Sequence, residues 1–380
     1  MNKNPKWLNG KKVAIVADWL TTYGGAEKVV LTVSEIFPEA PIFTSQYSEK
    51  EVDWFSNKQV KTGWLNIFPA KMRKILPVGR VLYFRNLGKK LKDFDVIISI
   101  CCAESKGLNI SEKQLHISYL QGPPIQYYWG MYDDYVNNPG FGKLSFLVRF
   151  FFKILVNPLR KNDFKLAQKP DFLIANSSYS KDEILKYYKR DASVVFPPVE
   201  VDKFKLERNK KDYYITTSRQ VNWKKLDLAV EAFSKNDKKL VLVGGGAEHQ
   251  KLVELAGGAK NIEFIPRISD PLELSKIVAE AKGFVFPSLE PFGIAPIEAL
   301  ATGTPVLAFD QGGAQDYIKD GENGVFFDKQ SSSAILKAVE KFEKTSFDTK
   351  KVSESAKKFS KENFKKNFEE EIKRNFNGKF

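Results

Sequence analysis

The chain has 380 residues, of which 43% are apolar and 13% aromatic, which is enough to bury sizeable cores and excludes a wholly disordered protein. Sixty Lys and Arg against 46 Asp and Glu leave a net charge of +14, which favours anionic partners such as phosphates, acidic lipids or nucleic acid. Two histidines and two adjacent cysteines are too few for a zinc site of such ligands, and they predict a reducing setting without disulfides.

The chain begins with a polar segment, residues 1–12, followed by a short apolar run at 13–17 that ends at Asp18. This run is typical of a buried strand rather than of a secretory signal. A later apolar stretch, residues 146–156, contains Arg149 and Lys153 and is shorter than the roughly 20 apolar residues that span a bilayer. We expect a cytoplasmic protein that does not cross a membrane but can bind peripherally at the inner face of the cell membrane.

Short β-branched runs alternate with helical patterns along the chain. The predicted strands are residues 13–17, 95–100, 117–120, 172–175 and 194–196, followed by 213–217, 240–243, 262–265, 284–286, 306–309 and 325–327. The predicted helices are residues 26–37, 181–188, 226–234, 272–281, 295–301 and 334–342. Most strands are apolar on both faces, as in a covered parallel sheet. The alternation predicts an α/β fold with two doubly wound, Rossmann-like domains.

The domain boundary is predicted at residues 197–200, because the two prolines there cannot continue a central strand and stiffen a linker. Residues 1–198 then form a first domain, and residues 199–355 form a second. Residues 356–380 carry apolar side chains four or five apart, which predicts an amphipathic helix that packs back on the first domain. Ligands bind α/β sheets at the carboxyl ends of their strands, so the expected site is a cleft across which the two domains face each other.

Residues 286–305 contain the strongest constellation of chemical groups. They follow a predicted strand and place Glu290 and Gly293 in a loop and Glu298 in a helix that starts near Ile294. The free amides and the dipole of such a helix favour a phosphate, and the two carboxylates can accept hydrogen bonds from ribose or sugar hydroxyls. In the plainer alternative, Glu298 complements the helix N-terminus and Glu290 is a solvated loop acid.

A second, basic constellation follows the first strand of the second domain. Arg219 and Lys224 would converge at the carboxyl end of that strand. A guanidinium and an ammonium group there can neutralise a diphosphate and the charge of a phosphate leaving group. The alternative, in so basic a chain, is that both are surface charges.

Glycines follow two of the predicted strands. Gly24 and Gly25 precede the first helix, and residues 244–246 follow a strand of the second domain. Glycine lets the backbone approach a phosphate closely, but the need for a tight turn explains both groups equally well.

Together these blocks resemble glycosyltransferase family 4, whose members are retaining enzymes of the GT-B architecture. The resemblance runs from Gly24 to about Phe327 and is most specific at the spacing of Glu290 and Glu298. Further matching segments are residues 240–244, 261–270, 312–316 and 321–326. Residues 118–135, preceded by residues 102–107, look closest to mannosyltransferase-like members that build surface polysaccharides.

The resemblance implies roles for individual residues. Arg219 and Lys224 would grip the diphosphate of a nucleotide-sugar donor, Glu298 would bind the ribose, and Glu290 would hold hydroxyls of the donor sugar. The other donor-binding positions that it implies are Gly25, Arg267, Ile268, Phe292, Gly293 and Ile294. Among these, Gly25 belongs to a first-domain loop that closes on the phosphates, and Arg267 with Ile268 would cradle the base.

Gln121 departs from the family pattern. Many relatives have a histidine at this position, which contacts the donor hexose. Glutamine can donate and accept a hydrogen bond but cannot carry a proton, so the departure affects the choice of donor sugar more than the reaction type. By resemblance the favoured donor is GDP-mannose, with UDP-sugars next.

The reaction that the resemblance implies is a same-face displacement without a metal or other cofactor. The diphosphate leaves, and one of its oxygens helps to deprotonate a hydroxyl of a glycan or lipid-linked glycan acceptor, so no general base is assigned. Asp93 and Asp95 look like the metal-binding Asp-x-Asp of another glycosyltransferase architecture, but they lead directly into a predicted strand.

Two segments of the first domain are basic and contain no acid. Residues 66–92 carry eight Lys or Arg and residues 141–161 carry five, mixed with large apolar residues. Such segments suit helices that lie on anionic lipid, and in this architecture the first domain binds the acceptor. We therefore expect a peripheral enzyme acting on a lipid-linked acceptor at an anionic membrane surface. The alternative is that these are core helices with a solvated basic face.

Two rival functions remain. A nucleotide-sugar 2-epimerase has a similar shape but needs no acceptor, and the match from Glu290 to Glu298 argues against it. A nucleic-acid-binding protein would fit the basic composition, but the sequence has no recognised RNA-binding or zinc-finger motif, so nucleic acid is not an expected partner.

Overall fold

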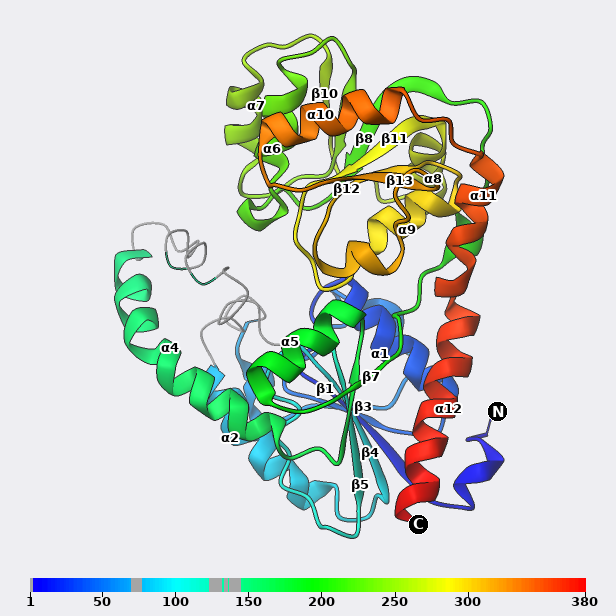
Figure 1. Cartoon of the computed structure of the whole chain (residues 1–380). Helices are drawn as coiled ribbons and strands as arrows, with labels where there is room; N and C mark the ends of the chain where they lie inside the picture. The colour runs from blue at the N-terminus through cyan, green and yellow to red at the C-terminus, as the bar shows by residue number, and fades with distance from the viewer. Residues whose placement is uncertain (1–2, 70–76, 123–131, 133–135, 137–144) are drawn as a thin grey trace. The chain divides into compact units, whose positions relative to one another are not determined.

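The structure is a computed structural model, and it describes residues 3–69, 77–122, 132, 136 and 145–380. It divides into two compact units (Figure 1). The first unit comprises Met1–Pro198 and Glu362–Phe380, and the second comprises Val199–Lys361. Each unit has its own sheet and its own hydrophobic core.

The first unit is built on a seven-stranded parallel sheet with the order β3-β2-β1-β4-β5-β6-β7. Its strands are β1 (Val13–Ala17), β2 (Ile42–Thr44), β3 (Val60–Lys61), β4 (Val96–Cys101), β5 (Leu115–Leu120), β6 (Phe172–Ala175) and β7 (Ser193–Val194). Ile15 of β1 pairs with Ile42 of β2 on one side and with Ile98 of β4 on the other. The direction of winding thus changes between β1 and β4, and the loops after these two strands meet at the carboxyl edge of the sheet.

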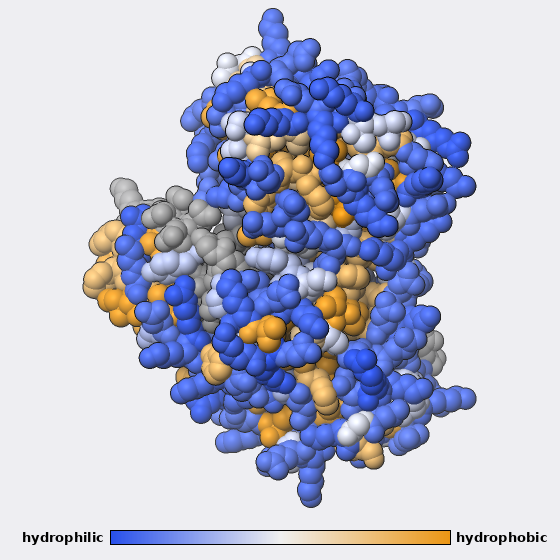
Figure 2. All heavy atoms as spheres, in the orientation of Figure 1, coloured by the Kyte–Doolittle hydropathy of each residue, from blue (hydrophilic) through white to orange (hydrophobic). Residues whose placement is uncertain are grey.

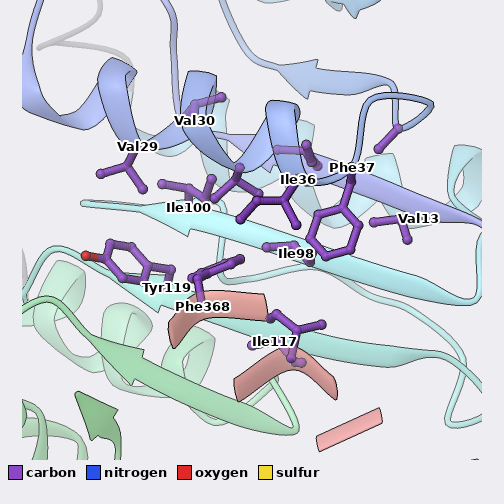
Figure 3. Close-up of a cluster of buried hydrophobic side chains, with 14 of the residues drawn as sticks. Val13, Val29, Val30, Ile36, Phe37, Ile98, Ile100, Ile117, Tyr119 and Phe368 are labelled. Atoms are coloured by element: carbon purple, nitrogen blue, oxygen red, sulfur yellow. The ribbon is translucent and has the colours of Figure 1, made fainter. Parts of the chain in front are cut away.

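Helices cover both faces of this sheet, which explains why its strands are apolar on both sides. The main helices are α1 (Gly25–Ile36), α2 (Pro77–Leu87), α4 (Ser145–Ala167), α5 (Ser178–Tyr188) and α12 (Lys361–Lys379). One face carries α1 and α12, and the other carries α2, α4 and α5. Figure 3 shows Val30 of α1, Ile98 and Ile117 of the sheet, and Phe368 of α12 in the core of the first face.

The last helix, α12, contributes to the core of the first unit although it follows the second unit in the chain. Its buried apolar residues are Phe364, Phe368, Ile372 and Phe376. Trp7 donates a hydrogen bond from Nε1 to Glu369 Oε1 at 2.8 Å, which fixes the amino-terminal segment against the helix. The helix begins at Lys361 and not at residue 356, because a 3-10 turn, Lys357–Phe359, precedes it.

The second unit is built on a six-stranded parallel sheet with the order β10-β9-β8-β11-β12-β13. Its strands are β8 (Lys211–Thr217), β9 (Leu240–Val243), β10 (Ile262–Ile265), β11 (Ala281–Phe286), β12 (Val306–Phe309) and β13 (Gly324–Phe327). Its helices are α6 (Leu226–Phe233), α7 (His249–Ala256), α8 (Pro271–Glu280), α9 (Ile294–Ala301), α10 (Ser332–Glu343) and α11 (Thr349–Ser355). The winding direction changes between β8 and β11, whose following loops are therefore neighbours.

Helices α6, α7 and α10 form a core with one face of the second sheet, while α8 and α9 pack on β11 (Figure 1). The two sheets with helices on both faces confirm the predicted α/β class with two doubly wound units. Among the described residues, no helix combines the length and the apolar character that a membrane span requires.

Candidate active site

The switch point of the second sheet brings Lys224 and Glu290 together. Lys224 follows β8 and Glu290 follows β11, and Lys224 Nζ lies 2.5 Å from Glu290 Oε1. Only 16% and 13% of these two side chains are exposed, so the pair is shielded from water. Ser288 donates a further hydrogen bond to the same carboxylate oxygen at 2.8 Å. Lys224 and Glu290 thus form one ionic cluster. The alternative in which Glu290 is a solvated loop acid is therefore wrong.

The loop that carries Glu290 is held in shape by the turn after β12. The amide of Gly313 donates to the carbonyl of Glu290 at 2.9 Å, and the hydroxyl of Tyr317 donates to the carbonyl of Phe292 at 3.0 Å. Burial, with a further effect of Glu290, raises the pKa of Tyr317 well above its usual value, so its hydroxyl stays protonated and keeps donating. A Cβ at Gly313 would lie 2.3 Å from the Cα of Phe292, so only glycine permits this approach.

The predicted phosphate-binding helix begins next to this loop. Gly293, with φ +92°, is the N-cap of α9 and supplies no capping side chain. The amides of Ile294 and Ala295 have no acceptor within the helix, and Pro296 has no amide hydrogen. The helix N-terminus therefore offers two amides and a positive dipole end to an anion. Glu298 lies half-buried one turn further along α9.

Arg219 is the second residue after β8, but it is exposed and has no ion-pair partner among the described residues. The backbone beside it is rigidly fixed by Gln220, which is fully buried. Gln220 donates from Nε2 to Gly244 O at 3.2 Å, and its Oε1 lies 2.7 Å from His249 Nδ1. The loop after β8 is thus bound to the glycine-rich turn after β9, a contact that the sequence patterns did not predict.

Arg267 and Ile268 follow β10, which lies two strands away from β8. Arg267 is exposed and Ile268 is half-buried. The parallel sheet places both residues at the same edge as Lys224 and Glu290.

Gly25 and Gln121 belong to the first unit, where they lie at the corresponding edge of the first sheet. Gly25 is the first residue of α1, after the N-cap Gly24. The loop before it is held by Glu27, whose Oε1 accepts a hydrogen bond from Thr22 at 3.0 Å. Gln121 follows β5, and its amide donates to Cys101 O at 3.0 Å. Residues 123–131 and 133–135, which belong to the predicted mannosyltransferase-like segment, lie outside the described residues.

Within the described part of the chain, no group of three or more His, Cys, Asp or Glu side chains is arranged to hold a metal ion. Asp95 lies at the amino end of β4, away from the switch point, where it accepts a hydrogen bond from Lys12 N and forms an ion pair with Lys11. The aspartates at 93 and 95 therefore contribute nothing to the carboxyl edge of the sheet.

Residues 198–365 match the model of the family described as glycosyl transferases group 1. A curated relative, the alpha-1,3/1,6-mannosyltransferase alg-2 of Neurospora crassa, is 28% identical over 224 residues, covering 45% of this chain and 48% of the relative. The O-antigen chain mannosyltransferase RfbU of Salmonella typhimurium is 29% identical over 182 residues, covering 44% and 48%. The chain thus spans about half the length of these curated relatives.

Solved structures match almost the whole chain. HepE of Anabaena, in complex with UDP, superimposes with a TM-score of 0.68 at 15% sequence identity, covering 95% of this chain and 99% of HepE. At this identity the likeness shows the fold, which is the GT-B fold of two Rossmann-like units. The chain therefore has the GT-B fold, and residues 198–365 match the model of the glycosyl transferases group 1.

Proposed function

We propose that the protein transfers a hexose, with retention of configuration, from a nucleoside-diphosphate sugar to a hydroxyl of a glycan or lipid-linked glycan. The observation that carries this proposal is the shielded pair of Lys224 and Glu290 beside the amino end of α9. A cation, an acceptor of hydroxyl hydrogen bonds and free backbone amides are the groups that a sugar diphosphate needs.

The residues of the second unit are proposed to bind different parts of the donor. Lys224 and Arg219 bind the diphosphate and stabilise the charge that grows on it as the sugar leaves. The free amides of Ile294 and Ala295, with that of the N-cap Gly293 beside the buried Phe292, bind the phosphate nearest the sugar. Glu298 accepts hydrogen bonds from the ribose. Glu290 accepts hydrogen bonds from the sugar hydroxyls. Arg219, Lys224 and the positive end of α9 supply the charge that a metal would otherwise provide, so the proposed transfer needs no metal.

The remaining predicted residues complete the donor contacts. Arg267 and Ile268 hold the base, Gly25 lets the loop before α1 approach the phosphates, and Gln121 contacts the sugar. The acceptor hydroxyl loses its proton to an oxygen of the leaving diphosphate, which is why no side chain is assigned as a general base.

GDP-mannose is the favoured donor, because the two relatives described above are named mannosyltransferases. A UDP-sugar is the second candidate, because the HepE structure contains UDP. The acceptor is proposed to be a growing surface glycan, in line with the O-antigen chain that the name of RfbU mentions.

The first unit is proposed to bind an anionic membrane surface through α4. Figure 2 shows hydrophobic side chains gathered over this helix, and Phe146 and Phe150 are 66% and 59% exposed. Arg149 and Lys153 lie among them, and the described helix has no acid before Asp163. Helix α2 differs, because its Tyr83, Phe84 and Leu87 are buried in the core, as the alternative interpretation expects. Residues 70–76 and 141–144 of the two basic segments lie outside the described residues.

A hydrolysis screen tests the proposed reaction. Wild type and Glu290→Ala are incubated with a panel of GDP- and UDP-sugars, and release of the nucleoside diphosphate is measured. We expect wild type to hydrolyse one donor preferentially and Glu290→Ala to be slower by on the order of 100-fold. Glu263→Ala is the control, because Glu263 is an exposed glutamate of β10 paired with Lys239.

Equal rates for wild type and Glu290→Ala would overturn the role of Glu290. A product in which the sugar is still attached to the nucleotide but has changed configuration would indicate an epimerase instead. Thermal stabilisation by RNA, and by neither GDP nor UDP, would indicate a nucleic-acid-binding protein.

A further inference from the structure

Asp18 is the first residue after β1 and lies at the switch point of the first sheet, with only 5% of its surface exposed. Its carboxylate accepts three hydrogen bonds from backbone amides in the turn after β4. Oδ2 accepts from Cys102 N at 2.7 Å and from Ala103 N at 2.9 Å, and Oδ1 accepts from Ser105 N at 2.8 Å. One side chain thus fixes the whole turn that faces β1 across the switch point.

Asp18 is itself held from the other side of β1. Its carbonyl accepts hydrogen bonds from both the amide and the hydroxyl of Ser45, which follows β2. The residue therefore connects the loops after β2, β1 and β4, in that order across the sheet. Such a buried carboxylate with satisfied oxygens is rigid, because any movement would leave amides unpaired.

The turn that Asp18 fixes forms a wall of a small pocket in the first unit. The pocket has a volume of about 30 Å³, enough for one water or hydroxyl group, and is lined by Asp18, Trp19, Ala26, Cys102 and Gln121 among others. The thiol of Cys102 donates to Gln121 Oε1 at 3.5 Å. Burial, with Asp18 adding to the effect, raises the pKa of Cys102 well above its usual value, so the thiol remains protonated and can donate.

The opposite end of the same amide lacks a partner among the described residues. Gln121 Nε2 is shielded from solvent and makes no hydrogen bond within the described part of the chain. A buried donor without an acceptor is unfavourable, so a ligand oxygen that accepts from Nε2 supplies the hydrogen bond that the free protein lacks. Because Oε1 accepts the hydrogen bond of the thiol, Nε2 is the atom of this amide that remains available to donate.

We propose that Asp18 and Cys102 are positioning residues for Gln121: Asp18 fixes the turn that carries Cys102, and Cys102 orients the side-chain amide so that Nε2 donates to one hydroxyl oxygen of the bound sugar. This inference rests on the proposed transfer from a nucleotide sugar, and it assigns roles to two residues that make no contact with the reacting atoms. It also explains how a glutamine at position 121, which cannot carry a proton as a histidine can, still donates a hydrogen bond to the sugar.

The test compares Cys102→Ala, Cys102→Ser and Asp18→Asn with wild type. Alanine removes the donor to Oε1, whereas serine restores one. Asparagine at position 18 keeps one acceptor oxygen and turns an NH₂ group toward backbone amides that need acceptors. Asp95→Asn is the matched control, because Asp95 also accepts a backbone amide but lies at the amino end of the same sheet.

Two measurements are made on the full chain. Crystal structures give the orientation of the Gln121 amide, and steady-state kinetics give KM and kcat for hydrolysis of GDP-mannose and UDP-glucose. We expect Cys102→Ala and Asp18→Asn to displace the amide and to raise KM about 5- to 10-fold, the loss of one neutral hydrogen bond, with kcat changed less than about 2-fold. Cys102→Ser and Asp95→Asn should have the same Gln121 orientation, KM and kcat as wild type.

An unchanged Gln121 amide in both Cys102→Ala and Asp18→Asn would overturn the inference. If Asp18→Asn does not fold, the comparison of Cys102→Ala with Cys102→Ser alone decides whether Cys102 orients the Gln121 amide. Wild type that hydrolyses neither donor would count against the proposed reaction with these sugars, while the crystal structures would still decide whether Asp18 and Cys102 position Gln121.

Discussion

Lys106 and Asp163 form a buried ion pair that joins the turn after β4 to helix α4, with Nζ 2.6 Å from Oδ1 and side chains 1% and 6% exposed. Tyr188 donates to the other carboxylate oxygen at 2.6 Å, and Lys106 also donates to the carbonyl of Ala103. Burial lowers the pKa of Lys106, but the charge of Asp163 more than offsets this, and the net pKa is raised. Lys106 is therefore charged at neutral pH, and it is buried against the carboxylate of Asp163.

Removing one member of this pair should destabilise the first unit strongly. Lys106→Met leaves Asp163 buried without its cation, and we expect a loss of about 3–5 kcal/mol in the free energy of unfolding, measured by chemical denaturation. The double variant Lys106→Met/Asp163→Leu should recover part of that loss, because no charge is then buried alone. A loss below about 1 kcal/mol in the single variant would show that the pair is not buried in solution.

His116 makes the first unit sensitive to acid. Burial lowers the pKa of this histidine to about 3. The charge of Asp171 opposes this shift, while the charges of Arg190 and Lys169 lower the pKa further. The unfolded chain binds a proton near pH 6.5 and the folded chain does not, so stability is full above pH 6.5 and falls as the pH is lowered toward 3. By pH 5 the expected loss from this residue is about 2 kcal/mol.

The comparison of wild type with His116→Gln isolates this effect. Both proteins are unfolded by denaturant at pH 7.5 and at pH 5. The decrease in the free energy of unfolding from pH 7.5 to pH 5 should be smaller in the variant than in wild type by about 2 kcal/mol. Equal pH dependence in the two proteins would show that folding does not change the pKa of His116.

The strand pattern was readable from the sequence because most strands are buried on both faces and therefore appear as short apolar runs. Two strands were missed: β2 has three residues and β3 has two, too short for any periodicity to appear. Helix α12 begins five residues later than the predicted residue 356, because nothing in the spacing of its aromatic residues marks the 3-10 turn Lys357–Phe359 that precedes it.

The candidate site was predictable only in part. Glu290 and Lys224 were proposed from motifs, but their direct contact joins residues 66 positions apart and has no local signal. Most of the supporting residues act through hydrogen bonds to atoms far away in the sequence, as Gln220, Tyr317 and Asp18 do. Ser288 instead bonds to Glu290, two positions along the chain. No periodicity or composition marks such contacts, so they emerge only from the fold.

The glycine turn after β12 offers a test of the donor loop that leaves every charged residue in place. A Cβ at Gly313 would lie 2.3 Å from Phe292 Cα and 2.6 Å from two backbone oxygens of the loop, so Gly313→Ala must displace it. We expect binding of GDP or UDP to weaken about 10-fold or more, equivalent to about 1.4 kcal/mol, in a calorimetric titration. Gly245→Ala is the control, because no atom lies within 4 Å of its added Cβ. Equal affinities in both variants would contradict a role of this loop in binding the nucleotide.

The contribution of α12 to the first core predicts a large effect at Phe368. This side chain is fully buried, and its ring centroid lies 5.8 Å from that of Tyr119 on β5. Phe368→Ala should lower the free energy of unfolding by about 3–5 kcal/mol, as for other large-to-small core substitutions. Phe380→Ala, at a half-exposed phenylalanine just beyond the same helix, should cost less than about 1 kcal/mol. Similar losses in the two variants would show that α12 does not belong to the core.

The exposed aromatic face of α4 predicts binding to anionic lipid, measured by co-sedimentation with vesicles. Wild type should bind vesicles that contain phosphatidylglycerol more strongly than vesicles of phosphatidylcholine alone, and less strongly as salt is added. The double variant Phe150→Ser/Phe151→Ser should lose at least about 10-fold in affinity, because burying one such ring contributes about 1.5–3 kcal/mol. Leu272→Ser, at an exposed leucine of α8 in the second unit, should bind like wild type. Two results would contradict this prediction: wild type that shows no preference for anionic vesicles at low salt, or a double variant that binds them as tightly as wild type. Helix α4 would then be a solvated helix, and its basic residues would bind some other partner.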